Sequence, residues 1–286
     1  MKKIAGLIKL LRPLQWYKNL LIFLPIVFIG QSIIYEKLVF TFIGFISLCL
    51  ISSTNYIIND IIDLKKDKLH PEKKKRSLAA GKVKVWQAVL ISIILGTTSF
   101  LIAWSIDILF LYAVLFLFVF TLIYSIFLKK EAFLDIIAIG INFIIRAVSG
   151  TFIIKSDISP WLILCTFFLA IYLAVGKRHA DTILLGNEAK NHRATLKIYS
   201  KELTNALMII TTCLLIVFYS LYSFMSKNSY LIYTLPFALY AVFRYFQLVY
   251  SGSTIARHPE RVFIDIRMVI GILIWGVATI IIIYFK

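Results

Sequence analysis

The chain has 286 residues, of which 60% are hydrophobic and only 16% are charged. Ordinary soluble domains contain roughly 45–50% apolar residues, so the composition excludes a soluble globular protein. The net charge of +17 would suit nucleic-acid binding, but the basic residues lie in short segments between long apolar runs. Orientation of a membrane protein in its bilayer explains that pattern, and we expect no nucleic-acid partner.

Charged and apolar residues alternate over the first thirteen positions, 1–13. This stretch lacks the unbroken apolar core of a signal peptide, and it predicts an amphipathic helix on the membrane surface. Pro13 is expected to end that helix. Trp16, Tyr17 and Lys18 are then expected to anchor the chain at the interface before the first span.

The rest of the chain is dominated by apolar segments near the roughly twenty residues that a helix needs to cross the hydrocarbon core. They cover residues 19–35, 38–62, 86–105, 107–128, 133–154, 160–176, 204–226, 229–250 and 264–285. With a cytoplasmic N-terminus, most of the 31 Lys and Arg residues fall on the cytoplasmic side. This asymmetry predicts nine transmembrane helices that start in the cytoplasm.

The expected fold is therefore an all-α integral membrane protein, with residues 1–286 forming a single polytopic transmembrane domain. Residues 1–13 form the interfacial helix, and the cytoplasmic loops are expected at 63–85, 129–132, 177–203 and 251–263. The cytoplasmic loops include the long ones, whereas the outside connections are mostly short. Chemistry is expected on the cytoplasmic face, because loops carry function when a rigid scaffold positions them.

An acidic run closes the second predicted span, with Asn55, Asn59, Asp60, Asp63 and Asp67. On a helix the three aspartates share one face, and the two asparagines lead into Asp63 at four-residue steps. Hard oxygen ligands at this position suit magnesium, which commonly bridges to substrate phosphates. The alternative is a solvated helix end, neutralised by its basic neighbours. Because polar groups at the apolar boundary are costly, we favour the metal site.

Two polar groups follow in cytoplasmic segments. In the basic run after the aspartates, Lys73 and Arg76 are candidates to bind phosphate, although such a run also suits anionic lipids. In the second group, Lys177, Arg178 and Asp181 share a helix face, offering cations to phosphates and a carboxylate to a metal. The segment also contains His179, a general base or merely a solvated loop histidine, and Glu188, Lys190, His192, Arg193 and Tyr199.

Five further residues could complete a pocket. Tyr124 and Lys129, with Ser125 and Asp135, either extend the pocket rim or mark the membrane interface. Arg146 lies within the fifth predicted span, where a charged group needs a partner. That partner is a phosphate in a polar cavity, a carboxylate such as Asp60, or a structural hydrogen bond across the bundle.

At these residues the sequence resembles the UbiA superfamily of membrane prenyltransferases. The run Asn59-Asp60-x-x-Asp63-x-x-x-Asp67, followed by His70-Pro71, Lys73, Arg76 and Ala80-Gly81, looks like its first signature motif. Further residues resemble the decaprenyl-phosphate phosphoribosyltransferases within it, over essentially the whole chain. They are Arg12-Pro13, Gln15-Trp16, Lys18-Asn19, Tyr124-Ser125, Leu128-Lys129, Leu134-Asp135, Arg146-Ala147, Gly150, Gly176-Lys177-Arg178 and Arg244-Tyr245. One departure is Ser77, where the family usually has proline.

The resemblance implies nine transmembrane helices around a central cavity, a cytoplasmic cap of loops, and magnesium. It implies transfer of phosphoribose from phosphoribosyl diphosphate to a polyprenyl phosphate, releasing diphosphate, in the cell membrane as part of cell-wall biogenesis. Asn59, Asp60 and Asp63 would be catalytic, with Asp67 and Asp181 also on the metal. Substrate would contact Lys18, Lys73, Arg76, Tyr124, Lys129, Arg146, Lys177 and Arg178. A homo-oligomer is possible.

Two rival functions remain. The nearer one is a prenyltransferase that moves a prenyl group from its diphosphate to an aromatic or other lipid acceptor. The cations of the second group favour phosphoribosyl transfer, because two phosphorylated substrates need more positive charge than one. The other rival, a transporter, predicts polar residues toward both faces, whereas the sequence concentrates them at one.

Overall fold

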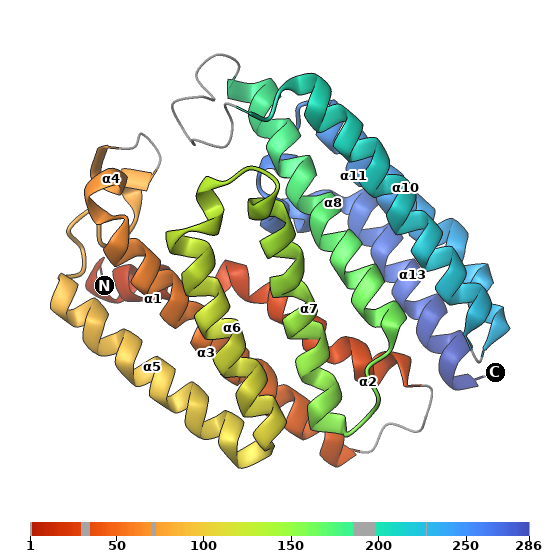
Figure 1. Ribbon diagram of the computed structural model, residues 1–286, viewed down its shortest axis with the longest axis horizontal. Coiled ribbons are helices and arrows are strands. Elements are labelled where there is room, and N and C mark those ends of the chain that lie inside the picture. Colours follow the sequence, from red (N-terminus) through yellow and green to blue (C-terminus); the bar gives the residue numbers. More distant parts are fainter. Residues whose placement is uncertain (1, 30–34, 70–72, 186–197, 227, 286) are drawn as a thin grey trace. The chain divides into compact units, whose positions relative to one another are not determined.

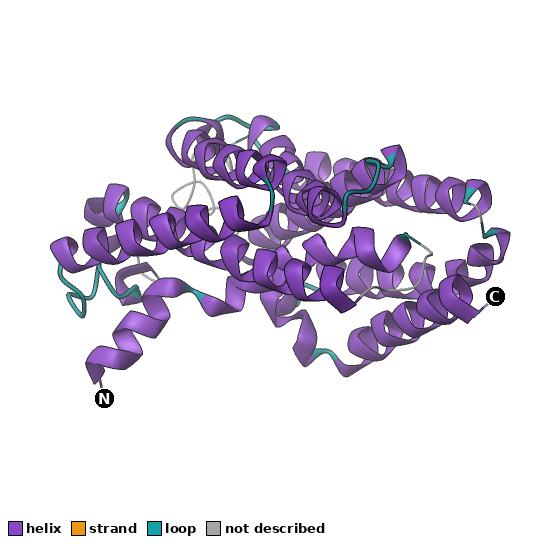
Figure 2. Cartoon of the chain, turned by 90° about the horizontal axis from the view of Figure 1, so that it is seen from below, coloured by secondary structure: helices purple, strands orange, loops and turns teal. Residues whose placement is uncertain are grey.

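The computed structural model describes residues 2–29, 35–69, 73–185, 198–226 and 228–285, and within them every regular element is helical (Figure 2). The elements, with η for 3-10 helix, are α1 (Lys2–Leu11), η1 (Pro13–Phe23), α2 (Leu24–Phe28), α3 (Tyr35–Ile62), α4 (Leu64–Leu69), η2 (Lys73–Lys75), α5 (Val85–Ile106), α6 (Ile108–Ile126), η3 (Leu128–Lys130), α7 (Leu134–Ile154), α8 (Pro160–Leu185), α10 (Lys201–Met225), η6 (Ser229–Thr234), α11 (Leu235–Tyr250), α12 (Thr254–Arg257), η7 (Pro259–Ile264) and α13 (Ile266–Phe285). The predicted all-α fold is confirmed.

Eight helices of the described residues are long and apolar enough to cross a membrane. They correspond to the second through ninth predicted spans. The first predicted span, 19–35, is instead the end of η1 followed by the short helix α2, and its last residues lie outside the described part of the chain. The count of nine spans therefore stays a prediction.

The helix boundaries show what local sequence determines. Asp107 separates α5 from α6, and its carboxylate accepts a hydrogen bond from the Leu109 backbone N–H at 2.7 Å, as an N-cap does. By contrast, α8 continues to Leu185, nine residues beyond the predicted end of the sixth span. The polar residues after Gly176 stay helical because buried partners elsewhere in the same unit bind them, as described below.

The chain forms two compact units. The first comprises Met1–Ile26, Ile33–Phe127 and Ile145–Asp157, and within it α3 and α5 run side by side (Figure 1). A methyl group added at Gly150 of α7 would lie 2.1 Å from the carbonyl oxygen of Ile22 in η1. Only glycine permits this close approach, so Gly150 has a packing role.

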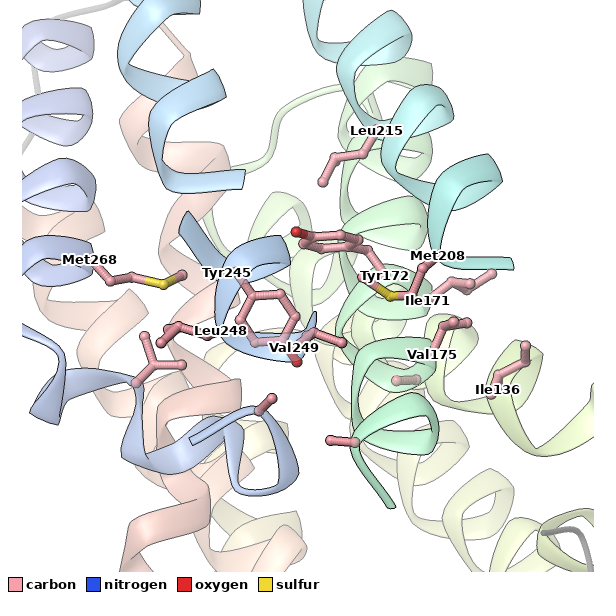
Figure 3. Close-up of a cluster of buried hydrophobic side chains, with 14 of the residues drawn as sticks. Ile136, Ile171, Tyr172, Val175, Met208, Leu215, Tyr245, Leu248, Val249 and Met268 are labelled. Carbon is pink, nitrogen blue, oxygen red and sulfur yellow. The ribbon is translucent and has the colours of Figure 1, made fainter. Parts of the chain in front are cut away.

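The second unit comprises Val27–Ser32, Leu128–Ile144 and Ile158–Lys286. Its core, drawn in Figure 3, centres on Tyr172 of α8 and Tyr245 of α11, whose rings meet edge to face with centroids 5.2 Å apart. The Tyr172 hydroxyl donates a hydrogen bond to the Val242 carbonyl oxygen at 2.6 Å. Gly176 lies directly against the Tyr245 ring, so its small size lets α8 and α11 approach closely.

Candidate functional site

The acidic run from Asn59 to Asp67 in the first unit lies on an almost continuous helix. The backbone N–H of Asp63 bonds to the Asn59 carbonyl oxygen, and that of Asp67 bonds to the Asp63 carbonyl oxygen, both at 2.9 Å. Helical hydrogen bonding therefore passes from α3 into α4. Asp60 and Asp67 are only 3% and 2% exposed, so they face the unit's interior rather than water.

Two arginines meet these carboxylates. Arg76 places one nitrogen, Nη1, 3.1 Å from Asp60 Oδ1 and 2.7 Å from Asp67 Oδ2. Arg12 places Nη2 2.5 Å from the same Asp60 oxygen. The group formed by Arg12, Asp60, Asp67 and Arg76 is called the arginine–carboxylate cluster below. Its charges balance, which explains how two carboxylates tolerate burial so close together.

Packing of the N-terminal helix against the 73–83 loop brings both arginines to the cluster. Leu10 of α1, Ile57 of α3 and Leu78 and Val83 of the loop are buried together. The Ser77 hydroxyl donates a hydrogen bond to the Gly6 carbonyl oxygen at 2.8 Å, which ties the loop to α1. Proline, which the family usually has at position 77, has no hydroxyl group. Ser77 therefore provides a hydrogen bond that proline could not make.

Asn55 supplies a buried oxygen beside the acidic run. Among the residues that the structure describes, its Oδ1 has no hydrogen-bond donor. A buried acceptor without a donor is costly and suits a cation or a ligand donor. No group of three or more Asp, Glu, His or Cys side chains in the described part of the chain forms a metal site by itself. The predicted ligands therefore do not form a closed protein cage.

The intramembrane arginine has a neutral partner. Arg146 of α7 donates from Nε to Oδ1 of Asn19 at 2.9 Å, and both side chains are buried. Asn19 Oδ1 also accepts from the Ser52 hydroxyl at 3.3 Å. Of the partners expected for Arg146, the structure thus shows the structural hydrogen bond across the bundle. Lys18, the residue before Asn19, lies with its Nζ 5.8 Å from the centroid of the Tyr17 ring.

A second ionic group lies in the second unit, and we call it the buried triad: Asp135, Arg178 and Tyr199. Arg178 places Nε and Nη2 3.1 and 3.0 Å from Asp135 Oδ2. The Tyr199 hydroxyl donates to Asp135 Oδ1 at 2.7 Å and accepts from the Phe133 backbone N–H at 2.9 Å. Burial and the bond to Asp135 both raise the pKa of Tyr199, so its hydroxyl stays protonated.

Two neighbours of Arg178 on α8 are also held within the second unit. His179 is buried, and its Nδ1 lies 2.9 Å from the Thr204 hydroxyl, so the solvated-loop alternative is wrong. In the described residues its Nε2 has no hydrogen-bond partner. Asp181, predicted as a metal ligand, accepts from Arg257 Nε at 2.9 Å.

The remaining predicted residues divide between the units. Asn59, Asp63, Lys73 and Tyr124 belong to the first unit and are partly exposed. Lys129 and Lys177 belong to the second unit and are also partly exposed. Six further predicted residues lie outside the part of the chain that the structure describes: His70, Pro71, Glu188, Lys190, His192 and Arg193.

The pattern of the UbiA prenyltransferase family matches residues 20–265. The chain belongs to this family. It is 29% identical to the decaprenyl-phosphate phosphoribosyltransferase of Mycolicibacterium smegmatis, over 93% of this chain and 88% of the relative. It is 28% identical to the protein of the same name from Mycobacterium tuberculosis, over 97% and 93% of the two chains.

A solved UbiA homologue from Archaeoglobus fulgidus, bound to GPP and Mg2+, has the same fold. The TM-score is 0.73 at 19% sequence identity, with 98% of this chain and 99% of that chain covered. Together with the apolar helices, family membership identifies this UbiA protein as a multi-pass membrane protein of the prenyltransferase type.

Sequence reasoning missed Arg12 as part of the site. Its pairing with Asp60 joins residues 48 positions apart, so no local spacing indicates it. The available signal was a basic residue directly before the proline that ends an amphipathic helix, with a carboxylate-rich helix end elsewhere in the chain. A buried carboxylate needs a compensating cation, and Arg12 is one of the basic residues that could supply it.

Proposed function

We propose that this UbiA protein transfers phosphoribose from phosphoribosyl diphosphate to a polyprenyl phosphate and releases diphosphate. The observation that carries the proposal is the arginine–carboxylate cluster, in which two guanidinium groups and two buried carboxylates meet where α3 ends. Such a site can bind a cation and phosphate oxygens together. The relatives named decaprenyl-phosphate phosphoribosyltransferase support the choice of donor and acceptor.

The residues present fit magnesium. Asp60, Asp63, Asp67 and Asn59 offer hard oxygen ligands on one run of helix, and the buried Asn55 oxygen lacks a donor among the described residues. Magnesium is usually held by one or two carboxylates plus substrate phosphates rather than by a complete protein cage. When bound, it would neutralise charge on the diphosphate leaving group.

Each residue has a defined task in this proposal. The carboxylates fix the position of the leaving group, and Arg76 and Lys73 bind its oxygens. The bond between ribose C1 and the diphosphate oxygen breaks as an oxygen of the lipid phosphate bonds to C1. The lipid phosphate is already anionic, so no strong general base is required. Catalysis then depends on positioning and charge stabilisation.

The other basic residues keep more limited roles. Lys18, Lys129 and Lys177 remain predicted contacts of the phosphates, with Tyr124 at the rim. Arg178 is bound by Asp135 within the buried triad, and we therefore assign it to packing. The polyprenyl tail would lie among apolar helices, in the cell membrane, with the phosphates on the cytoplasmic side as the distribution of Lys and Arg indicates.

Purified protein with ribose-labelled phosphoribosyl diphosphate, a polyprenyl phosphate and Mg2+ tests the proposal. We expect a labelled lipid, and we expect Asp63→Ala to reduce its formation at least ~100-fold, a typical loss for one electrostatic group in a site. The control is Asp157→Asn, an exposed carboxylate after the C-terminal end of α7, which should keep full activity.

Two results would overturn the proposal. The first is absence of labelled lipid alongside consumption of a prenyl diphosphate with an aromatic acceptor, which would establish prenyl transfer instead. The second is full magnesium-dependent activity in Asp63→Ala, which would remove the acidic run from the mechanism.

A further inference from the structure

Arg12 is fixed against one face of α3 by three residues at helical spacing, Ser53, Tyr56 and Asp60. The Ser53 hydroxyl lies 2.9 Å from the carbonyl oxygen of Leu11, the residue before Arg12. The guanidinium carbon lies 5.0 Å from the centroid of the Tyr56 ring, and Nη2 reaches Asp60. Backbone, aromatic and ionic contacts therefore converge on one arginine.

The backbone at Arg12 is also unusual. Its φ of 53° and ψ of 56° are in the left-handed region, which residues other than glycine seldom adopt. The turn is held by the Gln15 N–H, 2.9 Å from the Arg12 carbonyl oxygen, and by Trp16 Nε1, 3.1 Å from the Ser53 hydroxyl oxygen. Such backbone conformations persist where the surroundings impose them, and they concentrate at functional sites.

The ionic contact creates a competition at one atom. Arg12 and Arg76 both bind Oδ1 of Asp60. A divalent cation bound there would meet two guanidinium groups of like charge, so at least one must withdraw. Arg76 retains Asp67 as a second partner, whereas Asp60 is the only carboxylate that Arg12 contacts in the described residues. Arg12, which would give up a single carboxylate, is therefore the better placed of the two arginines to withdraw.

We propose that Arg12 is an exchangeable counter-ion: it neutralises Asp60 before substrate binds, yields this carboxylate to the divalent cation, and then binds an oxygen of the diphosphate. The inference rests on the proposed function and adds a substrate-binding residue to it. The side chain is 23% exposed, so it can turn toward a ligand, and Tyr56 remains in contact as a support.

If Arg12 is exchanged in this way, its substitution should raise the affinity for the metal and lower the affinity for diphosphate. Without Arg12 the metal competes at Asp60 with one guanidinium, that of Arg76, instead of two, so Arg12→Gln should bind Mn2+ alone about tenfold more tightly than the wild type. The same variant should bind inorganic diphosphate in saturating Mg2+ about tenfold more weakly, because a charge-assisted hydrogen bond is lost. A purely structural role would weaken both.

Both affinities are measurable on the full-length protein in nanodiscs, Mn2+ binding by electron paramagnetic resonance and diphosphate binding by calorimetry. Lys9→Gln is the matched control, because it removes one positive charge from the exposed face of α1, three residues away. It should leave both affinities unchanged. Arg12→Lys keeps the charge and should fall between wild type and Arg12→Gln, which covers the case in which the glutamine variant folds poorly.

The outcomes separate this inference from the proposed function. If the wild type binds Mn2+ and forms product but Arg12→Gln shows no gain in metal affinity, Arg12 is not an exchangeable counter-ion and the proposed function stands. If the wild type binds neither Mn2+ nor diphosphate, the proposed function fails and this inference fails with it.

Discussion

The two ionic groups contain the same chemistry, arginine bound to aspartate, in different surroundings. In the arginine–carboxylate cluster, the Arg12 and Arg76 side chains are 23% and 25% exposed. In the buried triad, Arg178 is 3% exposed and Asp135 is fully buried. Access of water to the cation therefore distinguishes a group that can exchange partners from one that cannot.

The difference follows from desolvation. A partly hydrated guanidinium can leave its carboxylate, because water replaces the lost hydrogen bonds. In a buried pair such as Arg178 and Asp135, water cannot replace the lost hydrogen bonds. Separating the pair therefore leaves a buried charge without compensation. The first arrangement suits binding of a charged ligand, whereas the second suits joining α7, α8 and the segment before α10 within one unit.

Removing the carboxylate of the buried triad should have the largest effect. Asp135→Ala leaves Arg178 charged, buried and without its partner, and we expect the free energy of unfolding to fall by about 3–5 kcal/mol. Unfolding of the purified protein in mixed micelles measures this loss. The apolar double substitution Asp135→Leu and Arg178→Met should recover most of it. Equal losses in the single and double variants would contradict a sealed ion pair.

Tyr199→Phe should have the next largest effect. It removes the hydroxyl that donates to Asp135 Oδ1 and accepts from the Phe133 N–H, so the buried carboxylate loses one hydrogen bond and the N–H loses this acceptor. We expect a loss of about 2 kcal/mol. Because the pKa of Tyr199 is raised in the folded state, its contribution is complete below pH ~10, the usual tyrosine pKa, and is lost as pH rises further.

Measuring the unfolding of wild type and Tyr199→Phe over a range of pH provides the control for that prediction. The stability difference between wild type and Tyr199→Phe should be constant from neutral pH to about pH 9 and should shrink above pH 10. A difference that grows with alkaline pH would show that Tyr199 ionises more easily in the folded protein, opposite to the direction inferred here.

Much of the fold could be predicted from the sequence. Apolar length alone located eight spans, and the proline after Arg12 ended the first helix as expected, with α1 stopping at Leu11. The segment 19–35 was harder, because apolar composition gives no information on whether a helix is continuous. It contains Pro25, and the structure gives a 3-10 helix followed by a short α-helix there.

The site was predicted in part. Helical periodicity placed Asp60 and Asp67 on one face, and both contact the same Arg76 nitrogen. Their cations could be predicted only as a class, since partners distant in sequence depend on packing. Arg146 and Arg178 illustrate this point. Both were predicted to contact substrate, with a carboxylate or a structural hydrogen bond as alternatives for Arg146, and the structure shows Asn19 and Asp135 as partners within the protein.

Asp67→Asn tests the arginine–carboxylate cluster, and we expect a smaller effect than for the two substitutions in the buried triad. Arg76 keeps its contact with Asp60, so we expect little change in stability. Loss of one carboxylate should raise the Mg2+ concentration for half-maximal activity about tenfold, equivalent to roughly 1.4 kcal/mol. Titration of activity with Mg2+ measures it. A large loss of stability at unchanged Mg2+ dependence would make the cluster structural, like the buried triad.

Ser77→Ala should give the smallest effect. That effect should be confined to the loop that carries Arg76. The substitution removes the hydrogen bond from the Ser77 hydroxyl to the Gly6 carbonyl oxygen, worth about 1 kcal/mol. Leu78 and Val83 remain buried beside Leu10, so the loop should stay in place but open more often. Amide hydrogen exchange should rise about fivefold in residues 76–83 and stay unchanged in α8. Thr97→Ala on the exposed side of α5 is the control, because the Thr97 hydroxyl donates to the carbonyl oxygens of Ile93 and Ile94 in its own helix. Unchanged exchange in the loop would show that apolar packing alone holds Arg76 at the carboxylates.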